Sequence, residues 1–191
     1  MKAGLAVRWE GTEVTAMAAT AAVHFVSLEE YLHSDWQPDV DYVDGVLEER
    51  LVGEIDHSDL QGALYAFFLA HRNEWQIRVN VEARVQVAPT RFRIPDVCIL
   101  PLTWEKTQIV REAPLLCLEV KSPTYTLKRE MTRAQDYMSM GVPEVWIFDP
   151  ESRTAYVLRG DEVIEQREGV LKLAGTAIEL DLARLFAVLD E

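Results

Sequence analysis

The segment that most constrains the fold lies between residues 115 and 148, where two apolar runs flank a helical pattern. Residues 115–121 read Leu-Leu-Cys-Leu-Glu-Val-Lys, which is typical of a buried strand whose last residues turn polar. Residues 126–140 predict a helix, because apolar side chains recur on one face, namely Leu127, Met131, Ala134 and Met138. Residues 145–148 read as a second buried strand. This order predicts a right-handed βαβ unit with parallel strands, and therefore an α/β fold.

Helix and strand signals also alternate before this unit. Ser27 and Glu30 have the spacing of a capping box and predict a short helix through about Leu32. The turn residues Asp44 and Gly45 predict a hairpin. Three longer segments follow, and we expect a helix over 56–68, one strand over 79–87, where valines and one alanine alternate with polar residues, and another strand over 94–100.

The C-terminal part predicts a short β-meander over residues 156–173 and a final helix over 182–189. We expect residues 1–24, which are small and Ala/Thr-rich, to form a flexible arm, and residues 25–191 to form a single domain. No apolar run approaches the ~20 residues of a membrane span, and no leader pattern opens the chain. Cys98 and Cys117 sit in apolar runs and are expected to be buried thiols, so we expect a cytoplasmic protein.

The acidic residues are unevenly distributed along the chain. The net charge is −13, and residues 27–59 contribute eleven acids against Arg50 alone. Residues 60–143 carry eleven Lys and Arg against eight acids and are the net-positive part. The acids elsewhere either keep the surface soluble or leave this middle part to meet a polyanion. Tight binding along long stretches of nucleic acid is not expected of such a chain.

Three residues of the middle part form a candidate catalytic set. Asp96 follows Pro95 near the start of one predicted strand, and Glu119 and Lys121 stand two apart at the end of the next. Side chains two apart on a strand share a face, and ligands of α/β proteins bind beyond strand ends. Two carboxylates can hold Mg²⁺ or Mn²⁺, while an ammonium orients water and offsets charge in phosphodiester hydrolysis. Taken alone, a Glu-x-Lys pair is more often a surface ion pair, so the set points to a nuclease only in combination.

Five short motifs carry a resemblance to a known family. In chain order they are Asp41-Tyr-Val-Asp-Gly45, His57-x-x-Leu60, Pro95-Asp-Val97, Leu118-Glu-Val-Lys-Ser-Pro123 and the stretch from Tyr137 through Gly-Val-Pro-Glu to Asp-Pro150. This pattern resembles the Uma-two family of bacterial proteins, which are grouped with restriction endonucleases of the PD-(D/E)XK superfamily. The resemblance spans about residues 25–160. It implies a restriction-endonuclease-like fold, with a central mixed β-sheet flanked by helices, in which Asp96 belongs to the PD element and Glu119 and Lys121 to the (D/E)XK element.

Other site residues follow from the same resemblance. Family members often carry Glu where Asp41 stands and Lys where Arg133 stands. Asp41 is therefore expected as a supplementary metal ligand, and Arg133, with Lys128 on the same predicted helix, as a phosphate contact. His57 lies in the first turn of its predicted helix and either lines the active cleft or is an ordinary packed histidine. No His or Cys pair has the spacing of a zinc site.

Two functions of different classes are compatible with these residues. The first is a Mg²⁺- or Mn²⁺-dependent endonuclease that acts on nucleic acid, with DNA as the expected substrate. A homodimer would supply two active sites for the two strands of a duplex. The second is a catalytically inactive module of the same fold that acts through protein contacts, which the acidic balance and the lack of a helix-turn-helix favour.

Overall fold

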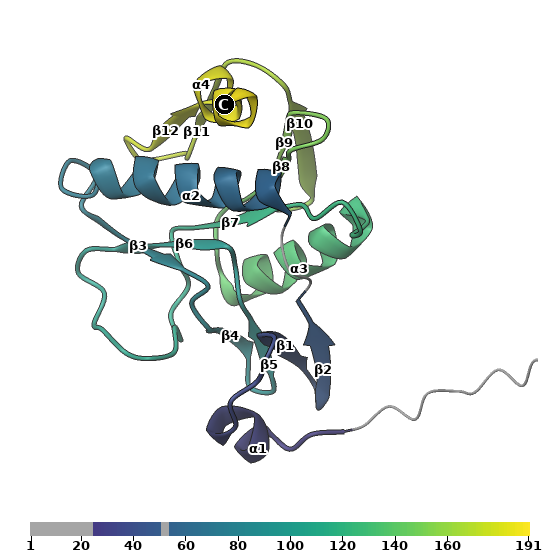
Figure 1. Ribbon diagram of the computed structural model, residues 1–191. Coiled ribbons are helices and arrows are strands. Elements are labelled where there is room, and N and C mark those ends of the chain that lie inside the picture. Colours follow the sequence, from purple (N-terminus) through teal and green to yellow (C-terminus); the bar gives the residue numbers. More distant parts are fainter. Residues whose placement is uncertain (1–24, 51–53) are drawn as a thin grey trace, which may run out of the picture.

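The computed structural model describes residues 25–50 and 54–191 of the chain (Figure 1). The arm predicted over residues 1–24 lies outside the described residues. The predicted helix start is confirmed, because the Ser27 side chain accepts a hydrogen bond from the backbone N–H of Glu30 and caps α1 (Leu28–His33). Within the described residues, no helix is both long and apolar enough to cross a membrane.

A six-stranded sheet forms the centre of the molecule. Its strands, in the spatial order β10-β9-β8-β7-β6-β3, are β10 (Glu162–Gln166), β9 (Thr154–Arg159), β8 (Val145–Asp149), β7 (Leu116–Val120), β6 (Val97–Pro101) and β3 (Ile77–Val81). Strands β7 and β8 run parallel and are joined by α3 (Leu127–Met140), whereas every other neighbouring pair in this sheet is antiparallel. The predicted βαβ unit and the mixed sheet are therefore confirmed.

A smaller antiparallel sheet lies beside the first. Its spatial order is β2-β1-β5-β4, with β2 (Val46–Glu49), β1 (Val40–Val43), β5 (Arg91–Arg93) and β4 (Val85–Ala88). The predicted hairpin is β1-β2, and its turn places Asp44 and Gly45 at positive φ. The aromatic rings of Tyr31, Tyr42 and Phe92 pack together and attach α1 to this sheet.

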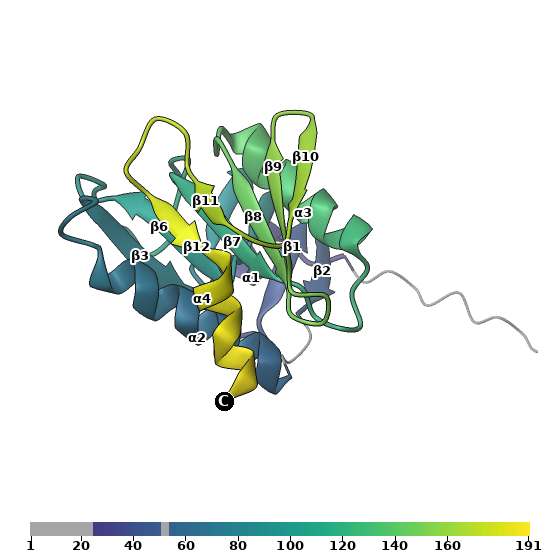
Figure 2. The same cartoon turned by 90° about the horizontal axis from the view of Figure 1, so that it is seen from above.

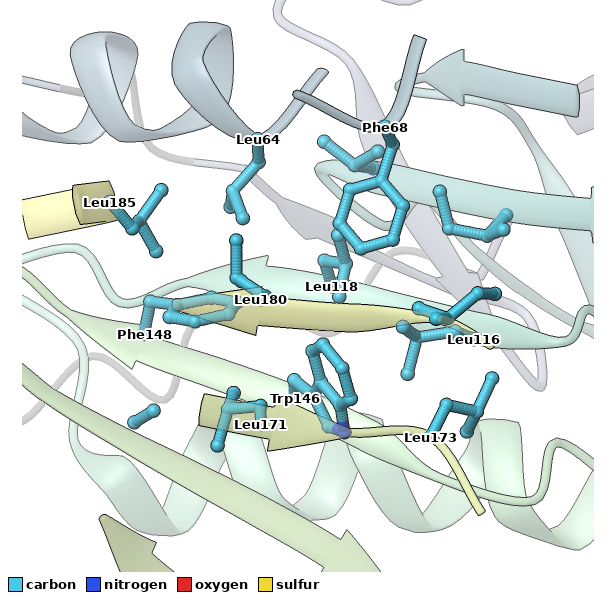
Figure 3. Packing of buried hydrophobic residues seen from close by; sticks show 14 of the residues in the cluster. Leu64, Phe68, Leu116, Leu118, Trp146, Phe148, Leu171, Leu173, Leu180 and Leu185 are labelled. Carbon is cyan, nitrogen blue, oxygen red and sulfur yellow. The ribbon is translucent and has the colours of Figure 1, made fainter. Parts of the chain in front are cut away.

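Helices cover the six-stranded sheet on both faces. Figure 2 shows α2 (Ile55–Ala70) and α4 (Leu182–Phe186) side by side on one face, with α3 on the opposite face. The face toward α2 and α4 is packed with apolar side chains, including Leu64, Phe68, Leu118 and Trp146 (Figure 3). Each of these four side chains is fully buried, and burying a side chain of this size stabilises the fold by about 1.5–3 kcal/mol.

Two predictions of strand extent need correction. The strand expected over 79–87 is two strands, because the chain leaves β3 at Glu82, which adopts φ 50, and enters the smaller sheet as β4. Apolar and polar residues alternate through both strands, because each strand is half-buried and requires a period of two residues. The sequence pattern therefore shows no break at Glu82. Of the meander predicted over residues 156–173, β9 and β10 pair in the six-stranded sheet, whereas β11 (Val170–Lys172) pairs with β12 (Glu179–Asp181) in a separate sheet. The last helix is α4, followed by a 3-10 turn over Ala187–Asp190.

Candidate active site

Asp96 stands just before β6 and is fixed from three directions. One carboxylate oxygen, Oδ2, accepts a hydrogen bond from the backbone N–H of Val120 at 2.7 Å. The other, Oδ1, accepts from Arg50 at 2.6 Å, and His57 Nε2 lies 3.4 Å from Oδ2. Only 2% of Asp96 is exposed. A carboxylate held in this way has one orientation, toward the end of β7.

Glu119 points from β7 toward α3. Its Oε1 accepts hydrogen bonds from the Tyr137 hydroxyl at 2.7 Å and from Arg133 at 3.0 Å. Both donors come from α3, where residues 130, 133 and 137 form a polar stripe beside the apolar one. Glu119 is as deeply buried as Asp96. A buried acid inside a strand is costly unless it is paired, and here α3 provides the pairing.

The two carboxylates line one small cavity. Its volume is about 20 Å³, and its walls are formed by Arg50, His57, Asp96, Glu119, Val120, Ser122, Tyr125, Glu130 and Arg133. A space of this size holds about one water molecule or one bare cation. The structure thus brings Asp96, Glu119 and His57 together on one cavity.

The cavity drives the pKa values of its two central acids apart. Burial raises the pKa of Asp96, but His57, Arg50 and the Val120 N–H stabilise its charged form, so the net shift is downward. Burial also raises the pKa of Glu119, the Asp96 charge adds to the rise, and Arg133 opposes it without cancelling it, so the net shift is upward. Neighbouring acids with opposite shifts are a recurring feature of catalytic sites.

Two further titratable groups face the cavity. Burial and repulsion from Glu119 raise the pKa of Glu130 from its ordinary value of 4.5 to about 7. Burial lowers the pKa of His57, but its hydrogen bond to Asp96 and the charge of Asp96 outweigh burial and raise the pKa. Glu130 can therefore exchange protons near neutral pH.

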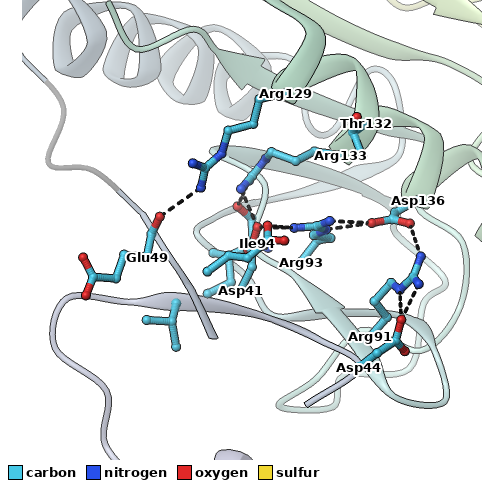
Figure 4. A network of polar contacts seen from close by, with 12 residues as sticks. Asp41, Asp44, Glu49, Arg91, Arg93, Ile94, Arg129, Thr132, Arg133 and Asp136 are labelled. Carbon is cyan, nitrogen blue, oxygen red and sulfur yellow. Dashed lines mark hydrogen bonds and ion pairs between the residues drawn. The ribbon is translucent and has the colours of Figure 1, made fainter. Parts of the chain in front are cut away.

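Asp41 lies behind the cavity, in a network of buried ion pairs (Figure 4). Its Oδ2 accepts hydrogen bonds from Arg93 and Arg133, and its Oδ1 accepts from the backbone N–H of Ile94. Arg133 thus bridges two acids, Asp41 and Glu119. In this arrangement Asp41 does not line the cavity. Its visible effect is to hold Arg133 against Glu119.

The two lysines of the predicted set lie outside the cavity lining. Lys121 follows the last residue of β7, and its ammonium is 3.5 Å from the carboxylate of Asp149 at the end of β8. The rule that alternate residues share a face applies within a strand, and β7 ends before Lys121. Lys128 is exposed in the first turn of α3. The cation in contact with Glu119 is Arg133.

A family model described as "Putative restriction endonuclease", the Uma2 family, matches residues 28–185. This match covers most of the chain. The protein belongs to the Uma2 family. The resemblance carried by the sequence motifs is thereby confirmed.

Two solved structures are also similar to this chain, to different degrees. A crystal structure described as a "putative nuclease belonging to DUF820" from Anabaena variabilis is 20% identical, with a TM-score of 0.75, over 86% of this chain and 99% of that chain. A chain of a DrdV–DNA complex solved by cryo-electron microscopy is 15% identical, with a TM-score of 0.41, over 71% of this chain and 12% of that one. None of the curated proteins compared with the chain matches it.

Several residues of this Uma2 site escaped the sequence analysis. Arg50 is the single base of an acidic stretch, and that isolation was a usable signal. Glu130 and Tyr137 belong to the polar stripe of α3, which helical spacing from Arg133 would have found. Tyr125 had no sequence signal, since it comes to the cavity through the loop between β7 and α3.

The carboxylates that line the cavity are ligands of the type that Mg²⁺ prefers. Within residues 25–50 and 54–191, no three His, Cys, Asp or Glu side chains converge into a ready metal cage. Mg²⁺ is commonly held by one or two carboxylates, with water and substrate phosphate completing the shell. Asp96 and Glu119 on one cavity offer this partial set, and Glu130 adds a third carboxyl to its wall.

A larger groove adjoins the cavity. It encloses about 530 Å³ and is lined by Glu48, Glu49, Arg93, Tyr125, Arg129, Thr132 and Arg133. Tyr125 and Arg133 belong to both spaces, so the groove and the cavity are adjacent. The Arg129 guanidinium lies 3.9 Å from the centre of the Tyr125 ring. A cation stacked on a ring is held in place by the ring's electron density.

Proposed function

We propose that this protein is a Mg²⁺-dependent endonuclease that hydrolyses phosphodiester bonds of DNA. The fold and the membership of the Uma2 family support a nuclease. The observation that carries the finer proposal is the convergence of two buried carboxylates, Asp96 and Glu119, on one cavity. Mn²⁺ has the same ligand preference and is expected to replace Mg²⁺.

Asp96 and Glu119 are the proposed metal ligands. When bound, the cation supplies a Lewis acid for a phosphate oxygen and lowers the pKa of water. Asp96 enters this role already ionised and oriented, because the Val120 N–H holds it. Burial raises the pKa of Glu119, and a bound cation would stabilise its ionised form, as Arg133 does. Asp41 acts one layer further out, as a positioning residue for Arg133.

The proposed cationic roles are divided among several side chains. Lys121 remains the proposed water-positioning residue. For this role its ammonium must leave the carboxylate of Asp149 and turn toward the bound substrate. Arg133 offsets negative charge from inside the protein, since it is buried and in contact with Glu119. Lys128 and Arg129, on the outer side of α3, are the proposed phosphate contacts, and Arg129 lines the adjoining groove.

One observation favours a second candidate function. The acids of the cavity are already matched by arginines, since Arg50 pairs with Asp96 and Arg133 with Glu119. A catalytically inactive module that acts through protein contacts would keep these pairs for stability alone. Metal binding separates the two functions, because only the nuclease must exchange an arginine for a cation.

The deciding experiment combines cleavage and calorimetry. We expect the purified protein to nick supercoiled plasmid DNA in Mg²⁺ or Mn²⁺ and to stop in EDTA. Asp96→Asn and Glu119→Gln should each lower the rate by at least a hundredfold and abolish Mg²⁺ uptake in titration calorimetry. The matched control is Glu179→Gln, which removes an exposed acid of β12 that is paired with Lys172. This variant should change neither the cleavage rate nor Mg²⁺ uptake.

Two outcomes would overturn this function. Cleavage that survives in both cavity variants would assign the activity elsewhere or to a contaminant. Absence of both cleavage and Mg²⁺ uptake in the unaltered protein would favour the inactive module. Sedimentation of the protein with and without a duplex tests the proposed homodimer, which should form at least on the duplex.

A further inference from the structure

A second groove lies along β3, at the edge of the six-stranded sheet. It encloses about 560 Å³ between α2, β3 and the loop after β6. Its lining shares no residue with the candidate active cavity or with the groove beside it. Volumes in this range are typical of spaces that hold a ligand.

The charge of this β3 groove is unusual for so acidic a chain. Arg72, Arg78 and Lys106 line it, and no Asp or Glu does. Among the described residues, none of these three cations forms an ion pair. Arg50, Arg93 and Arg133 of the active-site region are paired with acids, whereas the three cations of the β3 groove have no acidic partner among the described residues. A concave surface with cations alone attracts anions.

Hydrogen-bonding groups complete the lining of the β3 groove. The Arg78 Nε donates to the backbone carbonyl of Leu102 at 3.3 Å, which orients the guanidinium. The Asn80 side-chain nitrogen is buried and has no acceptor among the described residues. A buried donor without an acceptor carries a free-energy cost that a ligand oxygen can relieve. The amides of Asn73 and Gln108 also line the groove.

The position of β3 connects this groove with Asp96. Asn80 is paired with Cys98, two residues along β6 from Asp96, which is about 7 Å along the strand. The backbone N–H of Glu82, just after β3, donates to the carbonyl of Asp96. A polymer that follows β3 is therefore led toward the acids of the cavity.

We propose that the β3 groove binds the phosphodiester backbone of a nucleic-acid strand. The proposal rests on the proposed nuclease function, which makes nucleic acid the polyanion this chain must hold. The cations come from three separate segments, the end of α2, β3 and the loop after β6, which suits successive phosphates of a strand. The half-buried ring of Tyr65 adds a surface for a sugar or base.

Binding without cleavage tests the groove by itself. Fluorescence anisotropy of a fluorescein-labelled 12-nucleotide strand and of its duplex is measured in EDTA with the full chain. The triple variant Arg72→Ala, Arg78→Ala, Lys106→Ala should weaken binding at least tenfold. The slope of log K against log [salt] is negative, and its magnitude should decrease by about 2 in this variant. Each lost phosphate contact removes roughly 0.7–0.9 from that magnitude.

A charge-matched triple variant is the control. Arg153→Ala, Arg167→Ala and Lys172→Ala remove the same charge from cations that are already ion-paired with acids. This control should weaken binding less than threefold, and thermal melting should show both triple variants folded. Equal weakening by the two triple variants, or none by the first, would overturn the proposal.

A single substitution and two competitors sharpen the test. Asn80→Asp keeps the side-chain size but replaces the unsatisfied donor by a carboxylate, so binding should weaken several-fold, and unchanged binding counts against the groove. Displacement of the strand by inorganic phosphate or by polyglutamate at equal charge concentration would overturn the nucleic-acid assignment. Resistance to both supports it.

The outcomes separate this proposal from the nuclease function. If no DNA is cleaved but binding depends on the three cations, the nuclease function fails and the groove assignment stands. If cleavage depends on Asp96 while the first triple variant binds and cleaves normally, the groove assignment fails and the nuclease function stands.

Discussion

One face of the six-stranded sheet packs on α2 and α4 through apolar side chains, whereas the opposite face carries buried ion pairs where it meets α3 and the smaller sheet. On the first face, Leu64 and Leu118 pack among other hydrocarbon side chains, and many alternative side chains would serve. On the second, Arg133 contacts both Asp41 and Glu119, and few substitutions would preserve that geometry.

This difference between the two faces indicates which face of the sheet carries the functional site. Burial of apolar side chains stabilises a fold directly. The attraction within a buried ion pair, in contrast, barely offsets the free energy needed to remove its charges from water. The second face also has an apolar cluster, around Cys117, Tyr137 and Ile147, and the ion pairs of Arg133 stand beside it. The charges gather where the cavity lies, which is why we locate function there.

The largest expected effect is the loss of the central cation on the charged face. Arg133→Met leaves Glu119 without an ion-pair partner and Asp41 with Arg93 alone, and should lower the free energy of unfolding by about 3–5 kcal/mol. Urea denaturation at pH 7 measures the loss. Arg133→Lys, which retains one charge, should lose less. A loss below 1 kcal/mol in Arg133→Met would show that water already screens these acids.

A cavity on the apolar face should cost slightly less. Leu118→Ala removes fully buried methyl groups beneath α2 and should lower the free energy of unfolding by about 2–5 kcal/mol. This loss should not depend on pH, whereas that of Arg133→Met should shrink as the pH falls, because protonation removes the charge of the acid left unpaired. If both losses respond equally to pH, the proposed contrast between the faces is wrong.

The third effect depends on pH. The pKa of Glu130 rises from 4.5 to about 7 on folding, so the folded state binds more protons between those values and loses stability as pH increases through them. Glu130→Gln does not titrate, and it should therefore be more stable than the unaltered protein at pH 8 by about 1–3 kcal/mol. At pH 4.5 the difference should nearly vanish. Thermal melting across this range measures it, and a difference independent of pH would contradict the prediction.

The smallest effect is expected at the surface. Lys172 and Glu179 form an exposed ion pair between β11 and β12, with side chains 69% and 57% exposed. Lys172→Ala should change the free energy of unfolding by less than about 1 kcal/mol, because water and side-chain entropy offset the attraction. A larger loss in urea denaturation would mean that charge stabilises this molecule outside its buried clusters too.

The sequence indicated the order of elements more accurately than their limits. Apolar runs flanking a helix predicted β7, α3 and β8, since buried strands and amphipathic helices impose distinct periods. The break at Glu82 was missed, because β3 and β4 both alternate although they belong to different sheets. Local periodicity records which side chains are buried, but not which strand will pair with which.

For the site, the sequence by itself determined the acids and the family, through Asp96, Glu119 and the motifs around them. Only the tertiary structure decided that Arg133 rather than Lys121 meets Glu119, and that Arg50 meets Asp96. The physical reason is that the partner of a buried charge is chosen by distance and desolvation in three dimensions. Arg50 and Asp96 are 46 residues apart in the chain, and no local pattern links them.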